Sequence, residues 1–90
     1  MLSEFRFLRK DNALLTADVS CTIEDETIVS SYTFPQSKLI PVFMTDAVKV
    51  MVDDVEQVSG VTEIDFASPV TYQFVMRNGE VVRYILTLDF

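Results

Sequence analysis

The Asn78-Gly79 pair, near the carboxyl end of the chain, constrains the fold more than any other stretch. Runs of β-branched and aromatic residues flank it on both sides within residues 70–90. Such a pair between such runs indicates a β-hairpin, because a type I′ turn needs positive φ at both central residues. A two-residue loop at this point predicts that Val75 faces Val82 and that Phe74 faces Arg83 across the hairpin.

In this register the second strand of the hairpin is apolar on both faces. A half-exposed antiparallel strand normally alternates apolar and polar side chains. The second apolar face therefore either packs against the rest of the chain, which we favour, or forms a patch for a partner, such as a second copy in a homodimer. The residues of this dimer patch are Val82, Tyr84, Leu86 and Phe90.

The remainder of the chain predicts one helix and four further strands. Strands are expected over residues 2–9, 15–23 and 27–34, and a short strand is expected over 61–66. Between them, residues 47–58 carry an apolar stripe at helical spacing, with Thr45 as its N-cap and Gly60 after its end. The expected fold is therefore α+β: an antiparallel sheet in β-β-β-α-β-β-β order packed against one α-helix, as a single domain over residues 1–90.

The charge of the chain is strongly acidic and uneven. Fourteen acidic residues against seven basic ones give a formal net charge of −7, and residues 11–65 hold eleven acidic and two basic residues, a net of −9. Such a chain is repelled by nucleic acid and by anionic membranes and is attracted to basic protein surfaces, although acidity can also serve solubility alone. The candidate partner-binding residues are Glu24, Asp25, Glu26, Asp53, Asp54 and Glu56.

The residue types needed for most catalysis are missing. The chain has no histidine and only two glycines, which excludes histidine-based acid–base chemistry, ordinary zinc sites and phosphate-binding loops. We therefore expect no enzyme, no cofactor and no metal. A single cysteine, Cys21, is expected on a buried strand face, where it acts as a small apolar filler. The lone cysteine, the lack of a signal peptide and the lack of an apolar span of about 18 residues predict a cytoplasmic protein.

These observations favour a non-enzymatic acidic module that binds a basic protein surface and forms a homodimer. The module is expected to bind neither nucleic acid nor membranes directly. If the basic surface binds nucleic acid, the module is an inhibitor, as are some small acidic phage and bacterial accessory proteins. This analogy rests on the general class of protein and on no sequence motif. One alternative is a structural subunit whose strand edges pair between copies. The other is a carrier of a small apolar ligand, with a pocket lined by Phe5, Phe7, Tyr32, Phe34, Phe43, Tyr72 and Phe74.

Overall fold

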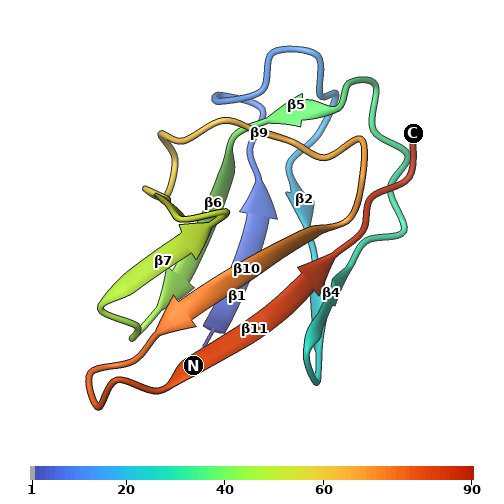
Figure 1. The fold of residues 1–90 in the computed structure, drawn as a ribbon. Coiled ribbons are helices and arrows are strands. Elements are labelled where there is room, and N and C mark those ends of the chain that lie inside the picture. The colour runs from blue at the N-terminus through green and yellow to red at the C-terminus, as the bar shows by residue number, and fades with distance from the viewer. Residues whose placement is uncertain (1) are drawn as a thin grey trace.

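The computed structural model describes residues 2–90, and within this range it contains strands and no helix (Figure 1). The predicted α+β class is therefore wrong, and the protein is all-β. The strands are β1 (Leu2–Phe7), β2 (Val19–Ser20), β3 (Thr22–Glu24), β4 (Thr27–Val29), β5 (Lys38–Leu39), β6 (Pro41–Thr45), β7 (Lys49–Val52), β8 (Val55–Glu56), β9 (Ile64–Asp65), β10 (Val70–Val75) and β11 (Val81–Leu86).

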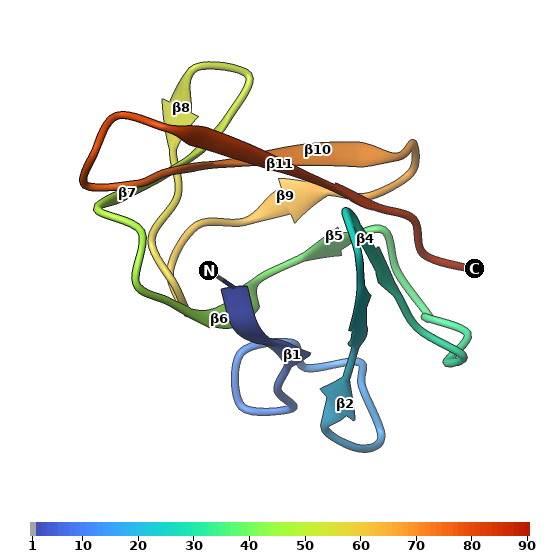
Figure 2. The ribbon, with the colours of Figure 1, turned by 90° about the horizontal axis from the view of Figure 1, so that it is seen from below.

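The strands form two main sheets that face each other. One sheet has the order β2-β1-β6 and the other has the order β3-β4-β11-β10-β7-β8, while β5 and β9 make a small third sheet. All pairs are antiparallel except β4 with β11. The chain passes between the two main sheets three times: at Cys21, over residues 30–40, which include β5, and over residues 46–48. Figure 2 shows β10 and β11 in one layer and β1, β2 and β6 in the other, as in a β-sandwich.

The helix predicted over residues 47–58 is replaced by the hairpin β7–β8. Val52 pairs with Val55 across a two-residue loop, in which Asp53 has φ 48° and Asp54 has φ 65°. Positive φ at both loop positions is the requirement of a type I′ turn, and Asp tolerates this conformation better than most residues. The valines also fit a strand, since alternate residues of β7, including Val50 and Val52, are buried. Valine is a poor helix former, so the strand burial decides the outcome.

The predicted hairpin at the carboxyl end is present, but its register differs by one residue. Val75 pairs with Val81 instead of Val82. The loop has three residues: the Met76 amide donates to the Glu80 carbonyl oxygen at 2.7 Å, and the Gly79 amide donates to the Met76 carbonyl oxygen at 2.9 Å. Only Gly79, with φ 90°, is left-handed in this loop. The loop is therefore a three-residue connection with glycine at the bulge position, and not the expected type I′ turn.

The one-residue shift exchanges the two faces of β11. Tyr84 and Leu86 now point into the space between the sheets, opposite Tyr72 and Val70 respectively, and both are buried. Arg83 lies on the outer face. Burying a large apolar side chain stabilises the fold by about 1.5–3 kcal/mol, which favours the register that places Tyr84 and Leu86 inside. Core burial therefore explains the observed register.

The core between the sheets is built mainly from aromatic rings. Phe5 and Tyr72 meet edge to face with ring centroids 5.2 Å apart, and Phe74 meets Tyr84 in the same way at 5.3 Å. Phe7 is completely buried and meets Phe66 edge to face, with ring centroids 5.5 Å apart. Edge-to-face pairs add about 0.5–1.5 kcal/mol each beyond area burial. The aromatic residues predicted to line a ligand pocket thus pack against one another.

The upstream strands are shorter than predicted. The strand expected over 2–9 is confirmed as β1. Of the strand expected over 15–23, only the second half forms strands, β2 and β3, and of the strand expected over 27–34 only the start does, as β4. The region 36–44, for which no strand or helix was predicted, holds β5 and most of β6. The short strand expected over 61–66 is β9.

The loop that precedes β2 is held by a buried asparagine. The Asn12 amide nitrogen donates to the carbonyl oxygens of Leu8 at 3.0 Å and Ile40 at 2.9 Å, and its oxygen accepts the Ile40 amide at 2.7 Å. Asn12 is 2% exposed. These bonds join the first loop to the β5–β6 junction, so the polar side chain takes the place of strand pairing there.

Candidate functional site

Part of β10 has an open edge. β7 pairs with β10 only along Gln73–Val75. The carbonyl of Val75 accepts the Val48 amide, so the backbone groups of Val75 point away from β11. Residues two apart in a strand direct their backbone groups to the same edge, so Thr71 presents its N–H and C=O on the β7 side as well. Within residues 2–90, no strand pairs with Thr71 on that side.

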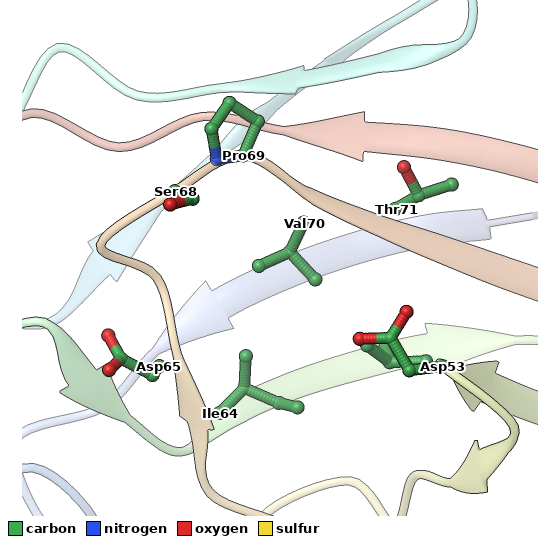
Figure 3. A pocket seen from close by; sticks show the side chains of 8 residues that line it. Asp53, Ile64, Asp65, Ser68, Pro69, Val70 and Thr71 are labelled. Atoms are coloured by element: carbon green, nitrogen blue, oxygen red, sulfur yellow. The ribbon is translucent and has the colours of Figure 1, made fainter.

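A cleft of about 420 Å³ lies beside this open edge. Figure 3 shows its position between the start of β10, the β7–β8 turn and β9. Its side chains come from three chain segments, and they combine aliphatic groups with two carboxylates and two hydroxyls. The lining residues are Val52, Asp53, Ile64, Asp65, Ser68, Pro69, Val70 and Thr71.

The two carboxylates, those of Asp53 and Asp65, stand on opposite sides of the aliphatic groups (Figure 3). Asp53 is placed by the type I′ turn, and Asp65 is fixed by accepting the Ala67 amide at 3.0 Å. Both are exposed, and in the described part of the chain neither forms an ion pair. Two negative charges beside apolar surface suit a lysine or arginine, whose methylene stem is apolar and whose end is charged.

The six predicted acidic residues do not form one surface. Glu24, Asp25 and Glu26 lie at the β3–β4 loop, whereas Asp53, Asp54 and Glu56 lie on the β7–β8 hairpin. These hairpins occupy opposite edges of the six-stranded sheet, five strand spacings apart, or about 24 Å. The cleft uses only Asp53 from the predicted set and adds Asp65, which sequence reasoning did not select.

The four residues of the predicted dimer patch are also separated. Tyr84 and Leu86 are buried in the core, Val82 is half-buried, and Phe90 is 52% exposed. They therefore do not share an exposed surface. The cause is the register of the hairpin, which turns the inner face of β11 toward the other sheet.

The described residues include no group of three or more His, Cys, Asp or Glu side chains able to hold a metal ion. Cys21 is half-buried, and burial raises the pKa of its thiol from 9.0 to about 12. The thiol is therefore neutral at pH 7 and a poor nucleophile, since the thiolate is the reactive form. A second cavity, of about 480 Å³, adjoins the β10–β11 loop and is lined by Asp46, Met76, Arg77, Asn78 and Glu80.

The fold and the cleft define a small all-β protein with an acidic, partly apolar cleft. Residues 2–90 hold no helix with the length and apolarity that crossing a membrane requires. No protein-family model matches the chain, and no curated protein or solved structure is significantly similar to it.

Proposed function

We propose that this protein is a non-enzymatic interaction module that binds a basic segment of a partner protein in the cleft beside β10. The observation that carries this proposal is the placement of Asp53 and Asp65 on either side of aliphatic surface next to the open edge at Thr71. The formal net charge of −7 adds long-range attraction to a basic partner.

An extended segment of the partner can add to the sheet at this edge. Its backbone would exchange hydrogen bonds with Thr71, as in other cases of strand addition. A lysine or arginine side chain of the segment would place its stem on Val70 and Ile64 and its charge between the two carboxylates. Exposed ion pairs contribute only about 0.2–1 kcal/mol each, so binding is expected to be modest, fast and sensitive to salt.

Where the basic surface of the partner is one that binds nucleic acid, we propose that the module acts as an inhibitor by occupying it. The acidic β3–β4 loop, with Glu24, Asp25 and Glu26, then guides the approach without entering the cleft. A reducing, cytoplasmic location suits this proposal, because the lone thiol forms no intrachain disulfide and is kept neutral by burial.

The test is titration of a fluorescently labelled Lys/Arg-rich peptide with the protein, followed by fluorescence anisotropy at low and physiological salt. The variant Asp53→Asn/Asp65→Asn removes the charges of the cleft, and Glu4→Gln/Glu80→Gln removes the same charge elsewhere on exposed positions. We expect the first variant to bind about tenfold more weakly or worse, and the second to change affinity by about twofold at most. Equal losses in both variants, or no binding at low salt, would contradict the proposal.

A further inference from the structure

The outer face of the six-stranded sheet, on the side away from β1, is not covered by any described element. In Figure 2 this face lies above β10 and β11, and β8 rises beyond it at one edge. Val81 is 39% exposed and Ile85 is 48% exposed on this face, and Arg83 lies between them. An antiparallel sheet face in contact with water normally carries polar side chains, so these residues indicate a surface that another molecule covers.

Opposite charges stand at the two ends of one row across this face. The pairing registers align Arg83 of β11, Gln73 of β10, Met51 of β7 and Glu56 of β8. Arg83 and Glu56 are three strand spacings apart, or about 14 Å, too far to pair within one chain. Neither forms an ion pair or a side-chain hydrogen bond with the other described residues.

The part of the face from β11 to β8 is nearly balanced in charge although the chain is not. Its strands carry Lys49 and Arg83 together with Glu56, a net of +1, whereas the whole chain has a net charge of −7. Two copies that meet through this face therefore avoid the repulsion that other parts of their surfaces would produce. The repulsion between the remaining charges is screened beyond about 8 Å at physiological ionic strength.

We propose that this face binds a second copy of the chain about a two-fold axis that runs parallel to the strands, between β10 and β7. This operation exchanges β11 with β8 and β10 with β7. Arg83 of each copy then lies opposite Glu56 of the other, and Gln73 lies opposite Met51. The same residues thus serve both copies, which is the property of a two-fold interface.

An apolar contact follows from the same operation. The ladder between β7 and β8 continues through the Gln57 amide, which donates to the Val50 carbonyl oxygen at 2.7 Å, so Val58 comes next to Lys49. Lys49 shares its row with Val75 and Val81. Val81 of one copy therefore lies near Val58 of the other, and Val58 is 52% exposed in the single chain.

The size of the face sets the strength of the dimer. The two-fold operation overlaps four strands of each copy, from β11 to β8, and at about 4.8 Å spacing and a length of about 20 Å these give a footprint of about 400 Å² per copy. Stable interfaces bury about 800 Å² per partner, so this dimer is weak and reversible.

The experiment is analytical ultracentrifugation from micromolar to submillimolar protein. We expect a monomer–dimer equilibrium, weakened about tenfold or more by either Arg83→Glu or Glu56→Arg. The double variant Arg83→Glu/Glu56→Arg reverses both charges, restores the attraction between copies and should return the dissociation constant to within about threefold of the original. Matched controls at exposed positions outside the face, Lys10→Glu and Glu63→Lys, should leave dimerisation unchanged.

Three results would overturn the proposal: a monomer at every concentration, equal weakening by the control variants, or a folded double variant that does not recover. Circular dichroism verifies folding for each variant. If a charge-reversal variant loses the circular-dichroism spectrum of the folded protein, Arg83→Gln and Glu56→Gln replace the reversals. Each of these should weaken the dimer without an effect on folding.

Discussion

The hydroxyl of Tyr72 offers a sharp test of the core, because removing it should stabilise the protein. Tyr72 is completely buried between the sheets, with its ring 5.2 Å from that of Phe5 and 6.3 Å from those of Phe43 and Phe74. Its hydroxyl oxygen has no hydrogen-bond partner among the described residues. Tyr72→Phe keeps the ring and removes only this oxygen.

The magnitude follows from the cost of burying a polar group without a partner. That cost is about 1–3 kcal/mol in proteins, and Tyr72→Phe no longer pays it. We expect the variant to unfold with a free energy about 1 kcal/mol higher at pH 7. For a domain of this size, such a change raises the melting temperature by about 4–8 °C.

The pH dependence adds a second signature. Burial raises the pKa of the Tyr72 hydroxyl above its ordinary value of 10.0. As pH rises past 10, the unfolded chain releases this proton while the folded chain retains it, so folding stability falls. Tyr72→Phe lacks this loss, and its advantage over the original protein should grow between pH 9 and about pH 11.

The assay is urea unfolding followed by circular dichroism at pH 7 and at alkaline pH. Tyr32→Phe is the matched control, because Tyr32 is only half-buried and its hydroxyl lies 3.4 Å from that of Thr16. The control should be neutral or slightly destabilised. A Tyr72→Phe variant that is less stable by about 1 kcal/mol would refute the reasoning, since it would mean that the buried hydroxyl has a partner.

Three further predictions concern single residues. Asn12→Ala should lower the unfolding free energy by about 3 kcal/mol in urea titrations, because it leaves the Ile40 amide and two carbonyl groups without partners. Cys21, with a pKa of about 12, should react with iodoacetamide at pH 8 far more slowly than free cysteine; equal reaction rates would contradict this prediction. Asp54→Gly should raise thermal stability by about 1 kcal/mol because φ is 65° there; a loss of stability would contradict the type I′ turn.

The carboxyl-terminal hairpin could be predicted from the sequence, but its register could not. The Asn-Gly pair indicates the turn, yet Asn78 uses its side-chain oxygen to accept the Glu80 amide at 2.9 Å, and only Gly79 takes positive φ. Two- and three-residue loops are both compatible with an Asn-Gly sequence at this position. The choice depends on what Tyr84 and Leu86 pack against, which is information from the opposite sheet.

The helix was predicted wrongly because the apolar residues between 47 and 58 fit two periods. Val48, Met51 and Val55 have helical spacing, whereas Val50 and Val52 have strand spacing. A helix over residues 47–58 places the Asp53-Asp54 pair on its exposed side, although Asp is also among the residues that tolerate positive φ. Valine content favoured the strand, and burial against the aromatic core made it the outcome.

The candidate site could be predicted only in part. Asp53 belongs to the acidic group recognised from the sequence, but Asp65 reaches the same cleft from a strand that pairs with β5. Nothing in the local sequence indicates that pairing, because β5 and β9 are two residues each and lie far apart in the chain. The open edge at Thr71 depends on where β7 ends, and β7 was predicted as helix.

The most direct test of the proposed function is a ¹H–¹⁵N NMR titration with the Lys/Arg-rich peptide. Binding at the cleft should produce the largest shifts at the amides of Thr71, Val70, Asp53 and Asp65, with the Thr71 amide shifting as its free N–H gains a partner. Shifts spread evenly over all acidic segments, or centred on the β3–β4 loop with Thr71 unmoved, would contradict a basic segment bound beside β10.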